Sequence, residues 1–517
     1  MAIIDFFDRG WMMNATGVAY RTDSETWTYE EAGRASCRIA HALLADGIAR
    51  ETKVAVLSPN APIAWICVLG IWRSGGAWVP LNPSSPVSDN ATLLGRFDVE
   101  VIFYDPSLQE QVEQIRARHR SIRFIALGEG TDDVDLDSWL DGHPDTRPDI
   151  AYDMDDVVAV APTGGTTGLP KGVMNTHRSF SVMVAHHMLA FVYPDDAQIV
   201  NLAAAPMTHS AGILTLHVTA RGGSVVIVPR ASPDTILAAI EGHSVTEMFL
   251  PPTVFYRLLE ELEHRDADTS SLRYLIYGAA PMSVEKLRLG IERLGPVLVE
   301  CYGQMEAPAA IAFLRPPEHL IDGKIAADSR LSSCGRPYPL LALAVKDPET
   351  GAEVAVGETG EICVQGDLLM KGYYKDPERT AEAIRDGWLH TGDLGHVDHE
   401  GYLQLTDRKK DMIISGGFNV YPGEVEQVIW AHPAVEDCAV VGAPDEDWGE
   451  RVTAVVELKP GAVVSADEVQ RRCREALGPV RTPKDVVFVD RLPRSVNGKV
   501  LKKDVRAMFW ANYGRTI

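Results

Sequence analysis

A regular alternation of short β-rich runs with helical patterns, between about residue 50 and residue 305, is the feature that most constrains the fold. The runs are rich in valine, isoleucine and aromatic residues and lie between turn-forming residues. They begin at Val54 (VAVLSPN), Val101 (VIFYD), Val157 (VVAVAP), Ser224 (SVVIVP), Tyr274 (YLIYG) and Val297 (VLVECYG). Apolar runs of this length are typical of strands buried on both faces. The alternation therefore predicts an α/β architecture, with helices packed over largely parallel sheets.

The helices between these runs have recognisable patterns. Thr28-Tyr29-Glu30-Glu31 forms a capping box that predicts a helix running to Gly47, and Val284, Leu287, Ile291 and Leu294 recur at helical spacing. The most apolar stretch, Ala61 to Trp72, contains Pro62 and is shorter than the ~20 residues needed to cross a membrane. It is predicted to be a buried helix.

The sequence pattern changes twice towards the C-terminus. After Ser332, strands punctuated by glycine and proline predict a smaller β-rich unit, as in GRPYPL, TGEICVQG and GYLQLTD. In the last hundred or so residues, the runs CAVVG, VTAVVEL and VVFVD frame a helix that begins at the capping box Ser465–Glu468. A length of 517 residues fits about three domain-sized units.

Composition limits the classes of function. Hydrophobic residues are 46% and charged residues 23%, as in ordinary globular proteins. The formal net charge of −23 provides no overall positive field for nucleic acid or an anionic membrane surface, so neither is a predicted partner. The first residues, MAIIDFFDRG, lack the pattern of a secretion signal, and the seven cysteines form no CxxC pair. We therefore expect a cytoplasmic protein without an integral membrane segment.

A loop rich in glycine and threonine directly follows the run at Val157. It reads Pro162-Thr163-Gly164-Gly165-Thr166-Thr167-Gly168-Leu169-Pro170-Lys171-Gly172. Glycines allow backbone N–H groups to turn towards an anion, threonine hydroxyls add donors, and Lys171 adds a positive charge. The loop is not a Walker motif, because Pro170 interrupts it and neither serine nor threonine follows Lys171. These residue types predict a polyphosphate-binding loop, and the alternative is a flexible surface loop.

Further motifs follow in a fixed order. They are APMTHSAG (205–212), YGAAP (277–281), YGQME (302–306), CGRP (334–337), TGD (391–393), DRKKD (407–411), GGFNVYP (416–422) and PRSVNGK (493–499). With these motifs the sequence resembles, over nearly the whole chain, the adenylate-forming superfamily that contains acyl-CoA synthetases, firefly luciferases and the adenylation domains of peptide synthetases. Within that superfamily it is most similar to the AMP-dependent acid–CoA ligases.

The resemblance implies a two-domain organisation. Residues 1–409 would form a large N-terminal domain of two packed α/β subdomains plus a β-rich subdomain, with the ATP and acyl sites. Residues 410–517 would form a small, mobile α+β C-terminal domain that carries the catalytic lysine and the thiol tunnel.

The resemblance also implies a carboxylic acid substrate and ATP, Mg²⁺ and coenzyme A as cofactors. The chemistry brings a carboxylate and the ATP α-phosphate together, so cations and donors must offset charge in the transition state. The family pattern assigns Glu306 to Mg²⁺, Asp393 to both ribose hydroxyls and Arg408 to the same sugar. The other implied nucleotide contacts are Thr163, Gly164, Gly165, Thr166, Thr167, Gly168, Lys171, an adenine wall of Gly278, Ala279, Ala280 and Pro281, and Tyr302, Gly303, Gln304, Met305 and Asn419.

Lys499 is the main predicted catalytic residue, because family members use this lysine to hold the substrate carboxylate and the α-phosphate. Lys410 matches the hinge about which the C-terminal domain rotates to withdraw Lys499. The rotation brings Gly416 and Gly417 alongside the acyl-adenylate, where Gly417 leaves room for the thiol arm of CoA.

The implied acyl pocket is mostly apolar. It is lined by His209, Ala211, Gly212, Tyr277, Ala279 and Gly303, and continues through residues 307–310. No aspartate near His209 could pair with an α-amino group, and no arginine or lysine could pair with a second carboxylate. We therefore predict a monocarboxylic acid with a medium-chain, branched, aromatic or alicyclic group. For His209, a chemical role and a packing role are both open.

Two positions depart from the family pattern. Gly164 stands where many relatives have serine, and Met305 where most have threonine. Loss of the threonine hydroxyl removes a donor to the adenylate phosphate, while Met305 places a flexible thioether beside the acyl pocket. We expect an active enzyme with unusual nucleotide contacts.

The leading hypothesis is an acid–CoA ligase, and three alternatives remain. A stand-alone adenylating enzyme would load the acyl group onto a carrier protein. A catalytically silent binding protein on the same fold is a second alternative, because fold does not determine function. A luciferase-like oxygenase is the third, supported by fold alone. A homodimer is left open as the oligomeric state.

Overall fold

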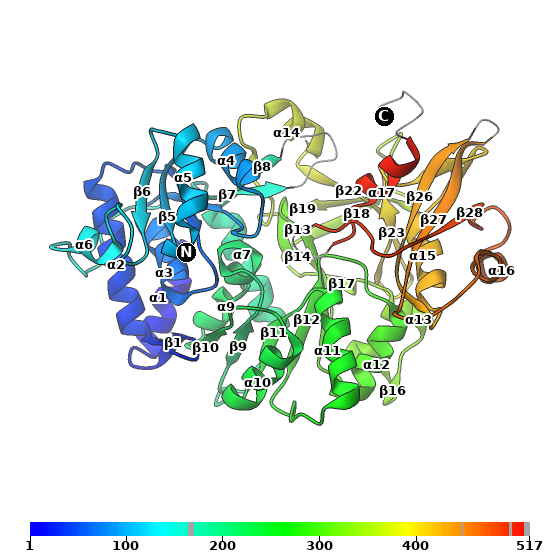
Figure 1. Cartoon of the computed structure of the whole chain (residues 1–517), viewed down its shortest axis with the longest axis horizontal. Helices are drawn as coiled ribbons and strands as arrows, with labels where there is room; N and C mark the ends of the chain where they lie inside the picture. Colours follow the sequence, from blue (N-terminus) through cyan, green and yellow to red (C-terminus); the bar gives the residue numbers. More distant parts are fainter. Residues whose placement is uncertain (164–169, 446–447, 496–498, 511–517) are drawn as a thin grey trace.

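The computed structural model describes residues 1–163, 170–445, 448–495 and 499–510, and for His209 and Ser210 it describes the backbone alone. The molecule is elongated (Figure 1). The N-terminal helices lie at one end of its long axis and the C-terminal strands at the other.

A seven-stranded sheet contains the first predicted β-rich runs. Its strand order is β20 (Gly372–Tyr373), β8 (Lys171–Thr176), β7 (Val157–Thr163), β4 (Ala77–Pro80), β3 (Lys53–Leu57), β5 (Val99–Tyr104) and β6 (Arg123–Ala126). Strands β7, β4, β3, β5 and β6 pair in parallel, as predicted, whereas β8 and β20 add antiparallel to the edge.

A nine-stranded sheet contains the later runs. Its order is β17 (Arg336–Pro337), β14 (Ala307–Leu314), β13 (Leu298–Gln304), β12 (Tyr274–Gly278), β11 (Glu247–Phe249), β9 (Val200–Ala203), β10 (Ser224–Ile227), β1 (Val18–Arg21) and β2 (Thr26–Thr28). The strands from β13 to β1 are parallel, and both edges are closed by antiparallel strands.

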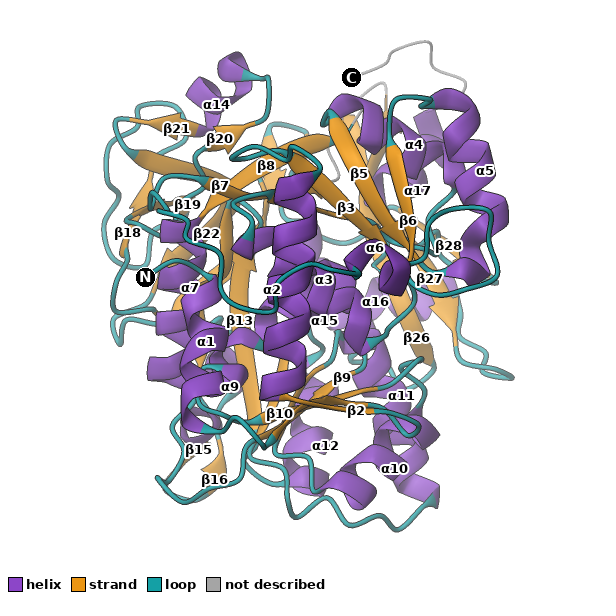
Figure 2. Cartoon of the chain, turned by 90° about the vertical axis from the view of Figure 1, so that its left-hand side faces the viewer, coloured by secondary structure: helices purple, strands orange, loops and turns teal. Residues whose placement is uncertain are grey.

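Alternation along the strands divides the core into layers. In β3, Val54 and Val56 face one cluster while Ala55 and Leu57 face another, because successive side chains point to opposite sides of a strand. The inner cluster lies between the two sheets and contains α1 (Ile4–Met13), α2 (Tyr29–Ala45), α3 (Pro62–Arg73), α7 (His177–Ala190) and α9 (Leu216–Thr219). The outer layers are α4 (Val87–Arg96) with α5 (Gln109–Arg118), and α10 (Pro233–His243), α11 (Pro252–His264) with α12 (Val284–Leu294). In Figure 2, α2 and α3 lie on one side of β3 and β5, and α4 and α5 on the other.

Two sequence-predicted helices form as expected. In α2, Thr28 accepts a hydrogen bond from the Glu31 N–H and Glu31 reaches back to Thr28, which completes the capping box. Helix α3 is buried on all sides, which explains why its sequence is apolar around the whole helix. No helix in the described part of the chain is both long and apolar enough to cross a membrane.

The predicted β-rich unit is a separate sheet. It contains β18 (Ala342–Lys346), β19 (Gly360–Gln365), β22 (Trp388–Val397), β21 (Ile384–Arg385) and β23 (Leu403–Arg408). Short elements complete the N-terminal part: α6 (Leu136–Leu140), α8 (Gly212–Leu214), α13 (Asp328–Leu331), α14 (Pro377–Ala383), β15 (Leu320–Ile321) and β16 (Lys324–Ile325).

The C-terminal sheet begins five residues after β23 ends. Its strands are β25 (Phe418–Val420), β24 (Ile413–Ser415), β27 (Gly449–Leu458), β26 (Val435–Asp445) and β28 (Asp485–Val489). Helices α15 (Pro422–Trp430) and α16 (Ala466–Leu477) cover one face, and α17 (Lys502–Trp510) packs on the other. The domain boundary predicted at Lys410 lies in the connection between the two sheets.

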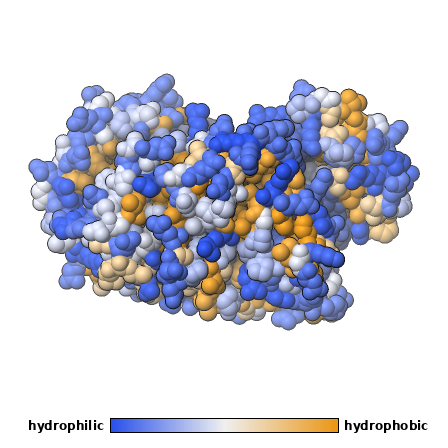
Figure 3. Space-filling view, turned by 90° about the horizontal axis from the view of Figure 1, so that it is seen from below, coloured by the Kyte–Doolittle hydropathy of each residue, from blue (hydrophilic) through white to orange (hydrophobic). Residues whose placement is uncertain are grey.

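The molecule has both hydrophilic and apolar surface areas, and its cysteines are unpaired. Hydrophilic residues cover much of the face shown in Figure 3, with smaller apolar areas between them. All seven cysteines are unpaired, and six of them are buried.

Candidate active site

An ion pair at the junction of β22 and β23 forms one side of the candidate site. Asp393 and Arg408 are opposite each other in these antiparallel strands, with Arg408 Nε 3.0 Å from Asp393 Oδ1. The Tyr302 hydroxyl, from β13, donates to Asp393 Oδ2 at 2.6 Å. Asp393 is only 5% exposed, and its charge raises the pKa of Arg408. An ionised acceptor beside a permanent cation can bind a group with several hydroxyls.

A second group of charges lies at the end of β13. Glu306 is 9% exposed, and its Oε1 accepts a hydrogen bond from the Tyr373 hydroxyl at 2.8 Å. The Lys171 ammonium lies 4.5 Å from the centre of the Tyr373 ring. Lys171 is opposite Thr163 in the β7–β8 hairpin. The predicted phosphate-loop residues Gly164, Gly165, Thr166, Thr167 and Gly168 lie outside the described residues.

Lys499 joins these charges from the C-terminal end of the chain. Its N–H donates to Ser495 Oγ at 3.2 Å, and its carbonyl accepts from the Ser495 N–H at 2.8 Å, so these two bonds fix the backbone of Lys499. The residue as a whole is exposed. Desolvation of the ammonium, together with the charges of Arg408 and Lys410, lowers the pKa of Lys499 to about 8, although Asp393 acts in the opposite direction.

Lys410 lies within electrostatic reach of both groups of charges, Asp393 with Arg408 and Lys171. Burial lowers the pKa of Lys410, and the charges of Arg408 and Lys171 lower it further. Four cations from three distant segments therefore lie close enough to influence one another: Lys171, Arg408, Lys410 and Lys499. Within a chain of net charge −23 they form a local binding region for anions.

Small residues shape the wall beside this region. A Cβ at Gly278 would lie 2.3 Å from the Cys301 carbonyl oxygen, so no side chain fits there. Ala279 follows with φ of +64°, a left-handed conformation that is strained for alanine. Ala280 and Pro281 continue the wall at the surface. The wall therefore consists of backbone and small side chains, which allow close contact with an aromatic ring.

Two family models match the chain over these regions. The model described as AMP-binding enzyme matches residues 8–374, and the model described as AMP-binding enzyme C-terminal domain matches residues 424–499. The chain belongs to the AMP-binding enzyme family. The family predicted from the ordered motifs is thereby confirmed.

Individual relatives cover nearly the whole chain. A medium/long-chain-fatty-acid–CoA ligase of Mycobacterium tuberculosis is 35% identical over 494 residues, which cover 91% of this chain and 84% of that protein. A feruloyl-CoA synthase of Amycolatopsis is 35% identical over 499 residues, which cover 96% of this chain and 97% of that protein. The solved structure of an amide bond synthetase from Marinactinospora thermotolerans has a TM-score of 0.88 at 32% identity, over 98% of this chain and 100% of that one. The predicted fold class is confirmed.

The residues predicted to line the acyl pocket of this family member occupy different environments. Ala211 and Gly212 are buried at the junction of a π-helical turn (Met207–Ala211) and α8. A Cβ at Gly212 would lie 2.2 Å from the Trp65 ring. His209 belongs to the same turn, and both roles considered for it stay predictions.

The Tyr277 side chain points away from the predicted acyl pocket. Its hydroxyl lies 3.3 Å from His319 Nε2, and its ring packs with α10, α11 and α12 in the outer layer. The neighbouring Ile276 faces the inner layer. The two-residue period of β12 therefore directs Tyr277 outwards, and only its backbone lies on the line that leads to Gly278 and Ala279.

Met305 borders a small apolar cavity. The cavity is lined by Trp78, Pro80, Ala159, Ala161, Phe180, Ile213 and Met305. The Met305 carbonyl accepts a hydrogen bond from Asn175 Nδ2 at 3.3 Å, and Gln304 Nε2 donates to the Thr391 carbonyl at 3.3 Å. Hydrogen bonds thus connect this segment to β8 and to β22, while the thioether faces apolar groups.

The remaining predicted residues lie on the C-terminal hairpin of β24 and β25. Gly416 and Gly417 have φ of +59° and +82°, which glycine adopts without strain. Gly416 N–H donates to the Trp448 carbonyl at 2.9 Å. Gly416, Gly417 and Asn419 are exposed, so the hairpin tip is available to a ligand.

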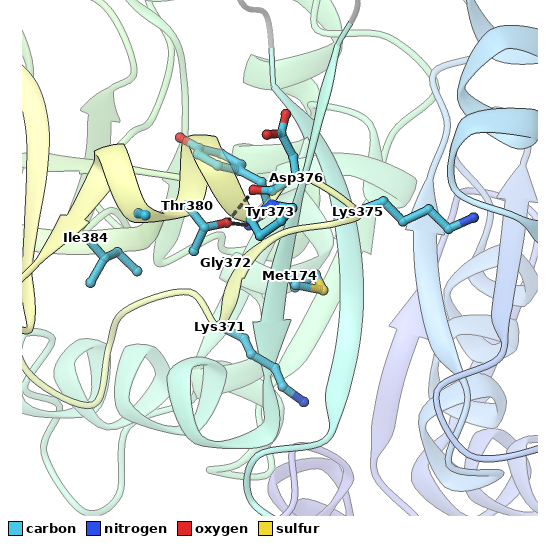
Figure 4. Close-up of a pocket in the computed structure, with 10 residues that line it drawn as sticks. Met174, Lys371, Gly372, Tyr373, Lys375, Asp376, Thr380 and Ile384 are labelled. Atoms are coloured by element: carbon cyan, nitrogen blue, oxygen red, sulfur yellow. Dashed lines mark hydrogen bonds between the residues drawn. The ribbon is translucent and has the colours of Figure 1, made fainter.

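Tyr373 is a residue that the sequence analysis missed. It lies beside a surface pocket of about 590 Å³ between β20 and α14 (Figure 4). Its N–H donates to Thr380 Oγ1 at 2.9 Å, and the Thr380 hydroxyl donates to the Asp376 carbonyl at 2.8 Å. Helix α14 thus fixes the backbone of Tyr373, while the Tyr373 hydroxyl donates to Glu306. The sequence around Tyr373 reads Gly372-Tyr373-Tyr374, and nothing in this run indicates a contact with Glu306.

Proposed function

We propose that this protein is an AMP-forming acid–CoA ligase that couples a monocarboxylic acid to coenzyme A. The carboxylate displaces pyrophosphate from ATP to form an acyl-adenylate, and the CoA thiol then displaces AMP to form the thioester. The observation that carries the proposal is the convergence of Asp393, Arg408, Lys171, Lys410 and Lys499 from distant segments. The fatty-acid and feruloyl specificities named for its relatives support the same reaction class.

In the first step, the cations would offset charge between two anions. Lys499 would hold the carboxylate and the α-phosphate, so that their repulsion falls as the new bond forms. Asp393, paired with Arg408, would accept hydrogen bonds from both ribose hydroxyls and fix the nucleotide. Lys171 would pair with the departing pyrophosphate at the base of the phosphate loop.

The donor chemistry at Glu306 fits a magnesium ion. Mg²⁺ is commonly held by one or two carboxylates together with substrate phosphates and waters. Glu306 provides one buried carboxylate oriented by Tyr373, and Lys171 lies close enough to share the phosphates. When bound, the ion would neutralise charge on the pyrophosphate leaving group.

In the second step, the C-terminal sheet would turn about Lys410. This residue lies between the end of β23 and the start of β24, where few residues connect the two sheets. The turn would withdraw Lys499 and bring the exposed Gly416–Gly417 tip to the acyl-adenylate, with Gly417 leaving room for the pantetheine arm. The domain limits 1–409 and 410–517 follow from this proposal.

The acid is proposed to be apolar beyond its carboxylate. The lining at Met305, Phe180 and Ile213 lacks charge, and burial of a second carboxylate there would be costly without a cation. A medium-chain, branched, aromatic or alicyclic acyl group fits this lining. The predicted cytoplasmic location and the homodimer stay predictions.

A product assay tests the proposal. Purified protein is incubated with Mg·ATP, CoA and a panel of short, medium, branched, aromatic and alicyclic acids, and pyrophosphate and thioesters are measured, the latter by mass. Acid-dependent pyrophosphate release with an acyl-CoA product supports the ligase and identifies its substrate class. Adenylate formation without a thioester would reject CoA as the acceptor, and a holo-carrier protein or an amine would then be tested. No turnover with any acid would reject the enzymatic proposal.

A further inference from the structure

A buried polar network in the inner layer contains none of the charged residues described above. At its centre is Glu247 of β11, which has no exposed surface. Glu247 accepts hydrogen bonds from the Tyr193 hydroxyl at 2.6 Å and from Asn201 Nδ2 at 2.9 Å, and its Oε1 lies 3.0 Å from His217 Nε2. Burial raises the pKa of Glu247, but His217 and these donors outweigh burial and the pKa is lowered. The proposed reaction assigns no role to this network.

The network leads to His187 on α7. The rings of His187 and His217 are 5.4 Å apart and nearly perpendicular. His187 Nε2 lies 3.3 Å from the Ala309 carbonyl oxygen, so Nε2 carries the proton and donates it to this acceptor. Burial and the neighbouring His217 lower the pKa of His187 to about 3, which keeps the imidazole neutral.

The remaining nitrogen of His187 suggests a role beyond stability. Its Nδ1 is buried and has no hydrogen-bond partner among the described residues. A buried acceptor without a partner costs free energy, and a phenyl ring of similar size would avoid that cost. The histidine must therefore compensate for this cost, and among the described residues its side chain hydrogen-bonds to the Ala309 carbonyl alone.

Ala309 has an unusual backbone. Its φ of +49° is in the left-handed region, which is strained for alanine within a strand. Its backbone lies against Gly303: a Cβ on Gly303 would come within 2.7 Å of the Ala309 Cα. Gly303 belongs to the segment that carries Tyr302 and Glu306. The conformation of Ala309 thus sets the shape of the wall next to the proposed acyl position.

The next residue is held in a similar way. His186 Nδ1 lies 3.2 Å from the Ala310 carbonyl oxygen, and His186 Nε2 accepts the Leu340 N–H at 3.1 Å. Two adjacent histidines of α7 therefore bind two adjacent carbonyls of β14.

We propose that His187, held in place by the buried His217–Glu247 pair, is a positioning residue for acid binding, because it maintains the strained Ala309 backbone against Gly303. This inference rests on the proposed acid–CoA ligase function. It concerns the acid side of Gly303 and leaves the proposed ribose contacts of Asp393 and Arg408 unchanged.

The test separates the KM for the acid from the KM for ATP. His187→Phe keeps the ring but removes the donor, and we expect the KM for the acid to rise about tenfold while the KM for ATP changes less than about twofold. His187→Gln retains an N–H that reaches Ala309 and should restore most of the acid affinity. His319→Phe is the matched control, because His319 is equally buried but bonds to Tyr277 in the outer layer; its acid KM should equal that of the wild type.

If His187→Phe folds poorly, the acid KM of His187→Gln against that of the wild type carries the test, and a second background adds an independent measurement. Glycine adopts a positive φ without strain. In Ala309→Gly, the backbone at this position should therefore keep its conformation without the bond from His187. His187→Phe should then raise the acid KM less in the Ala309→Gly background than in the wild type. An unchanged acid KM in His187→Phe, equal rises in both KM values, no rescue by glutamine, or the same rise in His319→Phe would overturn the inference. Inactivity of the wild type with every acid would instead reject the proposed function.

Discussion

At the scale of single residues, Tyr373 connects the proposed metal ligand to the phosphate-loop lysine. Tyr373→Phe removes the hydroxyl that donates to Glu306 but keeps the ring beside Lys171. A hydrogen bond to a charged group contributes about 1.5–3 kcal/mol. We therefore expect the concentration of Mg²⁺ that gives half-maximal pyrophosphate release to rise about tenfold.

Tyr374→Phe is the control for this variant. It removes an equivalent hydroxyl that donates at 2.6 Å to Asp98, outside the site. The Mg²⁺ dependence of this control should match the wild type. Identical Mg²⁺ dependence in all three proteins would contradict the role assigned to Tyr373.

The pKa of Lys499 gives a prediction on pH. Desolvation and neighbouring cations lower this pKa to about 8, so the amine loses its charge as the pH rises through that value. If the charge is required, kcat/KM for the acid, which reports on the free enzyme, should fall about tenfold per pH unit above pH 8. Lys499→Arg, which stays charged, should move this alkaline limb to higher pH. An unmoved limb in Lys499→Arg would assign the titration to another group.

Single residues also show what the sequence could and could not predict. Asp393, Arg408 and Lys499 were predicted because each belongs to a motif, and the structure brings their charges together, while their roles stay predictions. The Tyr277 side chain was expected in the acyl pocket, but strand alternation directs it to the outer layer. Tyr373 could not be found, because its contact with Glu306 depends on a strand pairing between distant segments.

At the scale of elements, the β24–β25 hairpin is proposed to reach the acyl-adenylate in the second step. Gly417 is exposed at its tip with open space around its Cα. Gly417→Leu should leave acid-dependent pyrophosphate exchange within about threefold of the wild type. It should lower thioester formation about a hundredfold, because the side chain would fill the path of the thiol.

Gly461→Leu controls for backbone strain. Gly461 has φ of +77°, close to the +82° of Gly417, and it also has open space around it. This variant should retain both half-reactions. Equal loss of thioester formation in both variants would attribute the effect to strain in the C-terminal unit.

Sequence patterns within a short segment predicted those helices and strands whose structure depends on neighbouring residues. The Thr28 capping box, the apolar α3 and the parallel runs at Val54, Val101 and Val157 form as expected. The antiparallel edges β8 and β14 and the π-helical turn at 207–211 were not predicted. Their pairing depends on residues far away in the chain, which periodicity within a short window does not report.

At the scale of the whole molecule, the connection at Lys410 is proposed to let one site perform two reactions. Lys410→Pro fixes φ at this position and restricts rotation between the two sheets. Adenylation should stay within about fivefold of the wild type, while thioester formation from supplied acyl-adenylate should fall about a hundredfold. Lys410→Ala removes the charge but keeps the rotation, so it should retain the second step. Loss of the second step in both variants would contradict a hinge at this residue.

The two-step mechanism is tested most sharply by the two half-reactions of Lys499→Ala. Acid-dependent exchange of labelled pyrophosphate into ATP reports adenylation, and CoA thioester formation from synthetic acyl-adenylate reports the second step. If Lys499 offsets charge only in the first reaction, exchange should fall at least about a hundredfold while thioester formation stays within about threefold. Equal loss of both half-reactions, or exchange near the wild-type rate, would contradict a role of Lys499 in adenylation alone.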